Sequence, residues 1–288
     1  MEQKGLIAWA KPMSHKEFAR FSEFIMAQCG IKMPQSKKVM LEARLQKRLR
    51  SLGISTFGEY YEHLHREGGD SELVHMLDAV TTNKTDFFRE PSHFEFLTQT
   101  ILPEFIEEQA RSGSRERPFR IWSAGCSSGE EPYTLAMVLN EFAEQHPPFP
   151  FTILATDLST RVLDRARTAI YDEERVAAVP PAMKQKYLLR SKDRDKGLVR
   201  IAPPLRAAVH FQRLNLMEEV LSFSDPLDAI FCRNVIIYFD RGTQERLLMR
   251  LCRVLRYDGY LFLGHSESIH GFDLPLKRIV STVHRKVG

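Results

Sequence analysis

The stretch Phe119-Arg120-Ile121-Trp122-Ser123-Ala124-Gly125-Cys126-Ser127-Ser128-Gly129-Glu130-Glu131 decides the fold. Its first four residues form a short apolar run typical of a buried strand, and residues 133–144 then follow a helical pattern. Gly125 and Gly129 favour a tight turn with close backbone approach to a ligand. The turn is neither G-x-G-x-x-G nor a P-loop, because no Gly-Lys-Ser/Thr follows it. The stretch therefore predicts the first strand, ligand-binding turn and helix of a parallel sheet.

The same alternation recurs through the rest of the chain. Strands are expected at residues 151–155, 209–213, 229–232 and 260–263, with helices at 161–169 and 243–255. Strands that alternate with helices predict a parallel sheet covered on both faces. A charged, hairpin-like piece at 191–197 lies between two apolar runs and predicts a small antiparallel insertion at about 186–207.

The first ninety residues show helical patterns and no strand signal. Helices are expected from Ser14 or His15 to Gly30, at 36–52, at 57–66 and at 71–80, and a further helix at 91–109 precedes the sheet. Four leucines of the second helix are predicted to form one buried stripe: Leu41, Leu45, Leu49 and Leu52. Residues 81–90 form a polar linker that would suit a lid at an active site. We expect a helical domain and linker at 1–90 and a second domain at 91–288.

Composition excludes several classes of protein. The chain has 288 residues, 43% of them hydrophobic, and a formal net charge of +4, which argues against disorder. No apolar run approaches the roughly 20 residues that span a bilayer, and the start at 1–9 lacks a signal peptide. The four cysteines are widely spread without C-x-x-C, against a disulfide framework or zinc site. We expect a soluble, cytoplasmic protein without a metal or membrane insertion, and nothing demands more than a monomer.

Candidate ligand-binding residues follow the expected strands, because ligands of open parallel sheets bind beyond the carboxyl ends of the strands. Glu130 and Glu131 would repel a pyrophosphate and favour a ligand with an ammonium or sulfonium beside an adenosine, or they simply favour the helix dipole. Asp157 could accept both hydroxyls of a ribose, or cap a helix, a role that Ser159 fills better. The segment 231–239 brings an arginine, an asparagine and a tyrosine to the same edge.

Five segments, in order, resemble the chemotaxis receptor methyltransferases, the CheR family. They are Thr82-Asn83-Lys84-Thr85-Asp86-Phe87-Phe88-Arg89-Glu90, Trp122-Ser123-Ala124-Gly125-Cys126-Ser127-Ser128-Gly129-Glu130-Glu131-Pro132-Tyr133, Ala155-Thr156-Asp157-Leu158, Ile230-Phe231-Cys232-Arg233-Asn234-Val235-Ile236-Ile237-Tyr238-Phe239, and Gly264-His265-Ser266-Glu267. The resemblance spans the chain from about residue 14 to its end. It implies an α/β protein with a class I (Rossmann-like) methyltransferase sheet, an N-terminal all-helical domain and a small antiparallel β insertion.

The resemblance also implies an activity: transfer of a methyl group from S-adenosylmethionine to glutamate side chains of methyl-accepting chemotaxis receptors, which leaves S-adenosylhomocysteine. The cofactor contacts that it implies are Asn83, Thr85, Arg89, Glu130, Asp157, Asn215, Leu216, Arg233 and Asn234. Arg89 and Tyr238 are expected to touch the reacting centre. A glutamate acceptor is ionised at neutral pH, its reference pKa being about 4.3, so no strong general base is required. His265 and His210 have no identifiable partners and are interpreted as structural.

Basic residues dominate between Lys32 and Arg50. Four of them, which we call the basic stripe, fall within an arc of about 100° on the second helix: Lys37, Arg44, Lys47 and Arg48. The stripe could dock an acidic helical bundle, a nucleic-acid backbone or an anionic membrane, or be a solvated face. With the resemblance, docking to the acidic methylation region of a receptor is the leading interpretation. Some family members also bind a peptide tether from the receptor C-terminus at the β insertion. Here the loop 191–196 lacks the glycines of those members, so tether binding stays open.

Three other functions compete with this interpretation. A nucleic-acid or small-molecule methyltransferase is one, although Asn234-Val235-Ile236-Ile237-Tyr238 does not match the Asn/Asp-Pro-Pro-Tyr segment of DNA amino-methylases. The second is a cofactor-binding regulatory module without turnover, and the third a nicotinamide oxidoreductase, disfavoured by the charge of Glu130. We expect no nucleic-acid partner.

Overall fold

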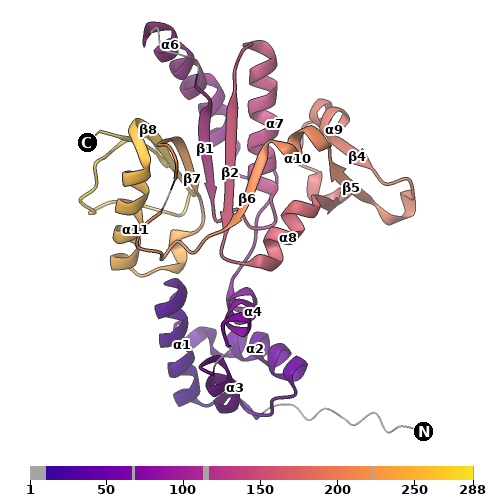
Figure 1. Cartoon of the computed structure of the whole chain (residues 1–288), viewed down its shortest axis with the longest axis vertical. Coiled ribbons are helices and arrows are strands. Elements are labelled where there is room, and N and C mark those ends of the chain that lie inside the picture. The colour runs from indigo at the N-terminus through magenta and orange to yellow at the C-terminus, as the bar shows by residue number, and fades with distance from the viewer. Residues whose placement is uncertain (1–10, 67–68, 113–116, 222, 288) are drawn as a thin grey trace.

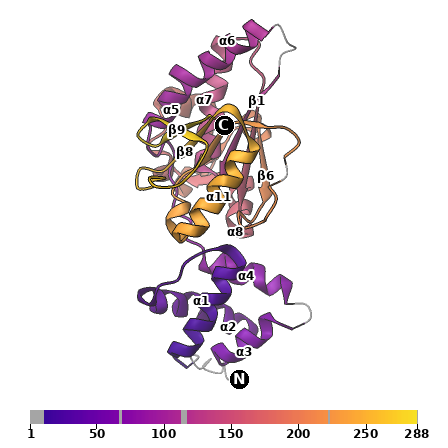
Figure 2. The ribbon, with the colours of Figure 1, turned by 90° about the vertical axis from the view of Figure 1, so that its left-hand side faces the viewer.

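The computed structural model describes residues 11–66, 69–112, 117–221 and 223–287. The chain start at 1–9 and residues 113–116, which precede the first expected strand, lie outside these residues. A bundle of helices from the N-terminal part lies beyond one end of a sheet-containing domain (Figure 1 and Figure 2). The expected α/β fold with an N-terminal all-helical domain is confirmed.

The helical domain contains α1 (His15–Cys29), η1 (Gln35–Lys37), α2 (Lys38–Leu52), α3 (Phe57–Leu64) and α4 (Asp70–Val80). Ser14 forms a capping box with Glu17 at the start of α1, and Gly30 ends that helix with φ 72°. Leu41, Leu45 and Leu49 are buried in the core of this domain. The prediction that Leu52 is buried is wrong. This last residue of α2 is 37% exposed because the chain turns away at Gly53.

The large sheet has seven strands in the order β6-β2-β1-β7-β8-β10-β9. Their bounds are β1 (Phe119–Ala124), β2 (Phe151–Asp157), β6 (Val209–Arg213), β7 (Leu227–Cys232), β8 (Leu255–Leu263), β9 (Leu276–Val280) and β10 (Val283–Lys286). The first five of these in sheet order are parallel, as predicted. Strands β9 and β10 were not predicted from the sequence; they pair antiparallel with each other and, through β10, with β8.

Helices cover both faces of this sheet. Along β1, Phe119 and Ile121 face one core cluster while Trp122 and Ala124 face the other, as the two-residue period of a strand requires. The first cluster includes α5 (Ser92–Phe96), the π-helical turn η2 (Leu97–Ile101), α6 (Leu102–Ser112), α7 (Glu130–Gln145) and α8 (Thr160–Thr168). The second includes α11 (Arg241–Val254). The helix expected at 91–109 is thus present with a π turn inside it.

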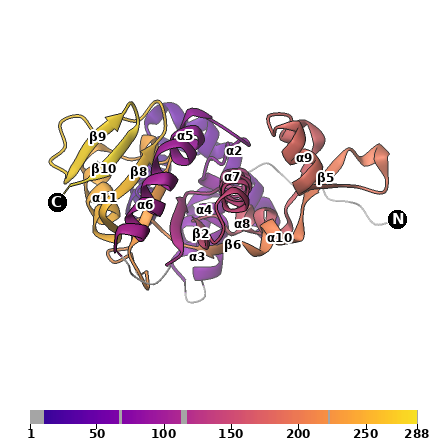
Figure 3. The same cartoon turned by 90° about the horizontal axis from the view of Figure 1, so that it is seen from above.

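A small antiparallel sheet lies at the other side of the large sheet from β8–β10 (Figure 3). Its order is β3-β5-β4, with β3 (Ile170–Asp172), β4 (Leu188–Arg190) and β5 (Leu198–Ile201). The short helices η3 (Glu173–Val176), α9 (Pro181–Tyr187), η4 (Arg194–Lys196) and α10 (Pro203–Ala207) accompany it. The expected antiparallel insertion is therefore present, but β3 precedes the predicted range and α10 occupies its end.

Two absences concern only the described residues. None of their helices is both long and apolar enough to cross a membrane. All four cysteines of the chain lie among these residues, and each is free and buried.

Candidate active site

A pocket lies at the carboxyl ends of β6, β2, β1 and β7, where the strand order reverses about β1. This edge is the usual ligand site of an open parallel sheet. Its opposite wall comes from the helical domain and the linker, residues 81–90. The pocket encloses about 1110 Å³ of empty space counted out to its open mouth. It brings together all the cofactor and reacting-centre residues expected from the resemblance except Glu130: Asn83, Thr85, Arg89, Asp157, Asn215, Leu216, Arg233, Asn234 and Tyr238.

The glycine-containing turn after β1 has the predicted tight geometry. Gly125 and Gly129 have φ 81° and 99°, which L side chains rarely adopt. A Cβ at Gly125 would lie 2.6 Å from the side chain of Val235, so only glycine allows the two loops to approach this closely. The backbone N–H groups of Gly125 and Cys126 both donate to the carbonyl of Thr156, at 2.8 and 2.9 Å. The turn is thereby fixed against the end of β2.

Asp157 is the buried carboxylate of the pocket. Its two oxygens accept the backbone N–H groups of Ser127 and Ser159, each at 2.9 Å. A carboxylate has about four acceptor positions, so each oxygen keeps capacity for a ligand hydroxyl. Burial raises the pKa of Asp157 above its ordinary value, although the backbone N–H groups oppose the shift. Ser159, not Asp157, caps α8 by accepting the N–H of Val162, as the sequence analysis expected.

Two neighbouring glutamates at the start of α7 lie in different places. Glu130 is fully buried and outside the pocket lining, and it pairs with Arg175 at 2.7 Å. Glu131 lines the pocket, accepts a hydrogen bond from Ser123 Oγ at 2.7 Å and pairs with Arg233 at 3.1 Å. Burial raises the pKa of Glu131, and Arg233 opposes the shift. Of the two glutamates, Glu131 lines the pocket, and the cofactor contact of Glu130 stays a prediction.

Arg233 connects the sheet with the linker. Its buried guanidinium pairs with Glu90 and with Glu131, each at 3.1 Å, and donates to the carbonyl of Arg89. One cation thus holds the end of the linker against the first turn of α7. Such a network favours a fixed position for the neighbouring Arg89 side chain.

Glu267 positions the loop after β7, a role that was not predicted from the sequence. Its carboxylate is buried and accepts the backbone N–H groups of Asn234 at 2.8 Å, Ile236 at 2.9 Å and Gly264 at 2.6 Å, with a longer contact from Ile237. Burial raises its pKa, opposed by these N–H groups. The side chain holds the loop after β7 in shape. Glu267 belonged to a quoted family segment, but nothing in its spacing indicated four backbone donors.

The linker has an unusual backbone on both sides of Arg89. Phe88 and Glu90 adopt φ 52° and 55°, conformations that non-glycine residues rarely adopt and that concentrate at functional sites. The N–H of Phe88 donates to Thr134 Oγ1 of α7 at 3.2 Å. Arg175 donates to the carbonyl of Thr85 at 3.0 Å. These contacts over-determine the linker and direct its polar residues to the pocket.

Asn215 and Tyr238 join the two domains. The side-chain amide of Asn215 donates to the carbonyl of Gln28 in α1 at 2.7 Å. The carbonyl of Tyr238, in the short helix η5 (Ile236–Tyr238), accepts the N–H of Lys32 at 2.8 Å. Burial raises the pKa of the Tyr238 phenol, so the hydroxyl remains a hydrogen-bond donor at neutral pH. The pocket is consequently built by both domains.

The basic stripe is only partly available to a partner. Arg44 donates to the carbonyls of Val80 and Thr81 at 2.6 and 3.0 Å. Arg48 forms a bidentate ion pair with Glu72, donating one hydrogen bond to each carboxylate oxygen. Among the described residues, Lys37 and Lys47 have no acidic partner. Lys37 is part of the pocket lining, and its ammonium lies 5.6 Å from the centroid of the Tyr238 ring.

The donor set of the pocket suits S-adenosylmethionine. Asp157 and Glu131 provide carboxylates for hydroxyls and an ammonium, while Leu214 and Leu216 provide an apolar surface of the kind that an adenine needs. Gly129 donates its N–H to Cys126 and thereby adds no free donor for a phosphate. The pocket therefore favours a cationic nucleoside over a pyrophosphate.

Comparisons with known proteins agree with this geometry. Residues 83–284 match the family model described as "CheR methyltransferase, SAM binding domain", and residues 16–81 match "CheR methyltransferase, all-alpha domain". The two family models meet at residues 81–83, at the start of the linker. The predicted domain boundary at residue 90 instead placed the linker in the first domain.

Named relatives cover nearly the whole chain. The chemotaxis protein methyltransferase of Borreliella burgdorferi is 42% identical over 94% of this chain and 94% of its own length. Chemotaxis protein methyltransferase 2 of Pseudomonas aeruginosa is 40% identical over 94% of this chain and 93% of its own. The chemotaxis protein methyltransferase of Escherichia coli is 40% identical over 89% and 85%. The resemblance inferred from the sequence is thus confirmed: the chain belongs to the CheR methyltransferase family and is an S-adenosylmethionine-dependent methyltransferase.

Proposed function

We propose that this protein transfers the methyl group of S-adenosylmethionine to glutamate side-chain carboxylates of bacterial chemoreceptors, with Arg89 and Tyr238 at the reacting centre. The observation that carries this proposal is the pocket itself. It combines a buried carboxylate, Asp157, with an arginine and a tyrosine on the wall built by the linker and η5. The names of the relatives, all chemotaxis methyltransferases, support a receptor as the acceptor.

The reaction needs positioning more than acid–base chemistry. When bound, S-adenosylmethionine supplies an electrophilic methyl group on a sulfonium, and the glutamate acceptor is already a carboxylate. The guanidinium of Arg89 can hold one oxygen of that carboxylate through a charge-assisted hydrogen bond. Tyr238, which stays protonated, can donate to the acceptor and orient it. Holding both partners in line accounts for much of the acceleration.

The cofactor contacts are assigned by position in the pocket. Asp157 would bind the ribose hydroxyls, and Leu216 would contact the adenine near Asn215. Glu131 would face the ammonium group of the methionine moiety, with Arg233 holding that carboxylate in place. Asn83 and Thr85 would close the pocket from the linker side.

Receptor docking would use the exposed part of the basic stripe. Lys37 and Lys47 offer cations without acidic partners among the described residues, and the first of these lies beside Tyr238. An acidic helical methylation region could therefore bind along α2 and reach the pocket mouth. Because such attraction is screened by salt, docking should weaken as ionic strength rises.

Three finer points belong to the same proposal. The enzyme would work as a monomer in the cytoplasm, where the methylation regions of chemoreceptors lie.

A receptor C-terminal peptide could add as a strand beside β4, whose Leu189 is 51% exposed. Binding of such a peptide to the purified protein, measured by fluorescence anisotropy, would decide this point.

The first experiment is calorimetric titration with S-adenosylmethionine and S-adenosylhomocysteine. We expect micromolar binding that Asp157→Ala abolishes and that Asp164→Ala, an exposed substitution on α8, leaves unchanged. Receptor fragments should then acquire base-labile methyl esters. If neither compound binds the wild-type protein, the cofactor assignment is wrong.

A further inference from the structure

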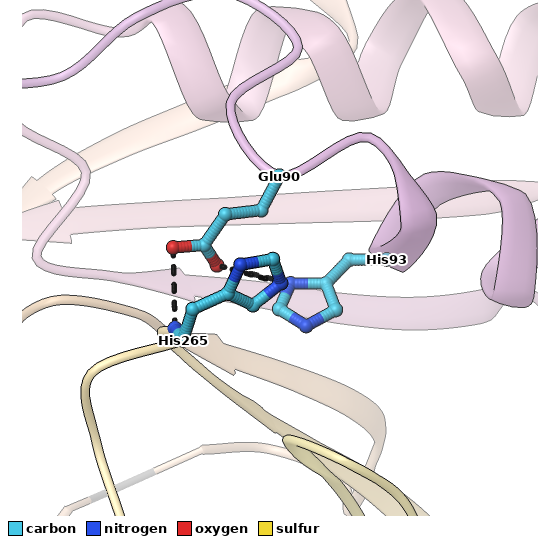
Figure 4. Close-up of side chains that lie close together, drawn as sticks. All are labelled: Glu90, His93 and His265. Carbon is cyan, nitrogen blue, oxygen red and sulfur yellow. Dashed lines mark hydrogen bonds and ion pairs between the residues drawn. The ribbon is translucent and has the colours of Figure 1, made fainter.

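Three side chains that commonly bind metals meet behind the linker, outside the pocket lining. They are Glu90 at the end of the linker, His93 in α5 and His265 after β8. One ligand atom from each lies within 4.8 Å of the others. Figure 4 shows the carboxylate and the two imidazoles close together, with Glu90 and His93 on one stretch of chain and His265 on a distant one.

His93 is the residue that points to a ligand. Its ring is 3% exposed, and its Nε2 is 2.6 Å from Thr282 Oγ1. Nδ1 faces Glu90 Oε2 at 3.5 Å and has no hydrogen-bond partner among the residues that the structure describes. In the tautomer in which Nε2–H donates to Thr282 Oγ1, Nδ1 presents a lone pair to the cluster, as in metal-binding histidines.

His265 provides the route from solvent. Its side chain is 56% exposed, and its Nε2 lies 3.9 Å from Glu90 Oε2. The ring also contacts that of His93, with centroids 5.3 Å apart. The sequence analysis found no partner for His265; the structure places it beside two.

Arg233 competes with an ion for Glu90, since its guanidinium lies 3.1 Å from the same carboxylate oxygen. The competition can be resolved because Arg233 also pairs with Glu131 at 3.1 Å and keeps that partner when Glu90 turns. Binding of a cation at the cluster would therefore replace the contact of Glu90 with Arg233 by a contact of Glu90 with the ion.

We propose that Glu90, His93 and His265 form a binding site for a divalent transition-metal ion, zinc in particular, which methyl transfer does not require. Two imidazole nitrogens and a carboxylate oxygen are a donor set that zinc prefers, and a fourth position stays open to water. Glu90 follows Arg89 directly, so drawing its carboxylate toward the ion shifts the linker. Zinc therefore weakens cofactor binding. This last consequence rests on the proposed cofactor pocket, whereas the zinc site itself does not.

The site is tested by titrating the full, chelator-treated chain with zinc chloride in a calorimeter. We expect one ion per chain and an affinity that His265→Ala lowers at least about tenfold. His270→Ala removes another exposed histidine of the same segment and should bind zinc like the wild type. No binding at tens of micromolar zinc, or undiminished binding by His265→Ala, would overturn the proposal.

Cobalt(II) gives a second readout that does not depend on affinity. His265→Cys replaces an imidazole with a thiolate, so the cobalt-loaded variant should show a sulfur-to-metal charge-transfer band that the wild type lacks. Absence of the band at saturating cobalt contradicts ligation at position 265.

The coupling is measured separately. Zinc should raise the Kd for S-adenosylmethionine in the wild type but not in His265→Ala, and an unchanged Kd would refute the coupling. Failure of the metal-free protein to bind S-adenosylmethionine would count against the proposed function and not against the zinc site.

Discussion

Arg44 of α2 donates hydrogen bonds to the carbonyl of Thr81, at 3.0 Å, and to that of the preceding residue. The helix that carries the basic stripe is therefore attached to the start of the linker. The linker in turn provides Asn83, Thr85 and Arg89 to the pocket. The side-chain amide of Asn83 donates to Thr81 Oγ1 at 3.1 Å, so hydrogen bonds connect α2 with a residue that lines the pocket.

Arg44→Ala should consequently weaken cofactor binding although the residue is not in the pocket lining. Loss of hydrogen bonds from a charged donor costs about 1.5–3 kcal/mol, so we expect the Kd for S-adenosylmethionine to rise by about tenfold or more. Lys47→Ala is the matched control on the same helix, because among the described residues only Arg44 of the basic stripe is shown to bond to the linker. Calorimetry should show an unchanged Kd for this control, and equal effects of both substitutions would contradict the attachment.

Glu267→Gln should disorder the loop after β7. An amide keeps one acceptor oxygen but turns an NH₂ group toward backbone donors, leaving buried N–H groups unpaired at about 1–3 kcal/mol each. We expect a lower melting temperature and a Kd for S-adenosylmethionine raised more than about tenfold. The exposed substitution Glu219→Gln should change neither quantity. Cofactor affinity retained by Glu267→Gln would show that the loop holds its shape without this carboxylate.

Gly264→Ala should displace the same loop by direct contact. An added Cβ would lie 2.4 Å from Asn234 Nδ2 and 2.9 Å from the backbone nitrogen of that residue, distances that real Cβ atoms do not show. We expect impaired cofactor binding and a destabilised fold. Gly58→Ala in α3 meets only an ordinary contact at 3.7 Å and should be neutral or stabilising by up to about 1 kcal/mol. Thermal unfolding of the two variants beside the wild type measures the contrast, which disappears if Asn234 can move freely.

Glu72 should make the stability of the helical domain depend on pH. Burial alone would raise the pKa of Glu72. Hydrogen bonds from Arg48 and Tyr60 lower it by more than burial raises it, so the net pKa lies below the ordinary value. The ionised Glu72 carboxylate contributes its full share of folding stability above the unfolded-state pKa of about 4.3. That share is lost as pH falls through the lower folded-state pKa.

Glu72→Gln should therefore cost about 1.5–3 kcal/mol at pH 7 and progressively less in acid. Denaturant unfolding of both proteins between pH 7 and pH 3 measures the difference. A difference that stays constant over this range would mean that the carboxylate charge contributes nothing. Glu62→Gln, at an exposed ion pair with Arg20, should show a much smaller effect at every pH.

Local signals were enough to predict the elements that position the site. The capping residues Ser14, Gly30 and Gly53 fixed helix ends, and apolar runs fixed β1, β2 and β7. Because parallel strands end at one edge, Asp157 and Arg233 could be placed together without knowledge of their contacts.

Contacts between distant segments could not be predicted in the same way. β9 reads Leu-Lys-Arg-Ile-Val and is mostly exposed, so its pattern lacks a buried face. The internal partners of Arg44 and Arg48 come from α4 and the linker, and helical geometry alone assigned both side chains to a docking surface. The different surroundings of Glu130 and Glu131 depend in part on Arg175, which pairs with Glu130 and which no local pattern connects to that turn.

The hydrogen bond from Asn215 to the carbonyl of Gln28 limits how this enzyme can be recombined. A chimera that takes its helical domain from a relative with another receptor preference would have to preserve this contact, together with the bond from Thr160 to Asp78 at 2.8 Å. Under the proposed docking along α2, exchange of the helical domain alone would alter the methyl-donor pocket along with the choice of receptor. Engineered receptor specificity in this scaffold therefore has to be selected with the interface and the catalytic domain as one unit.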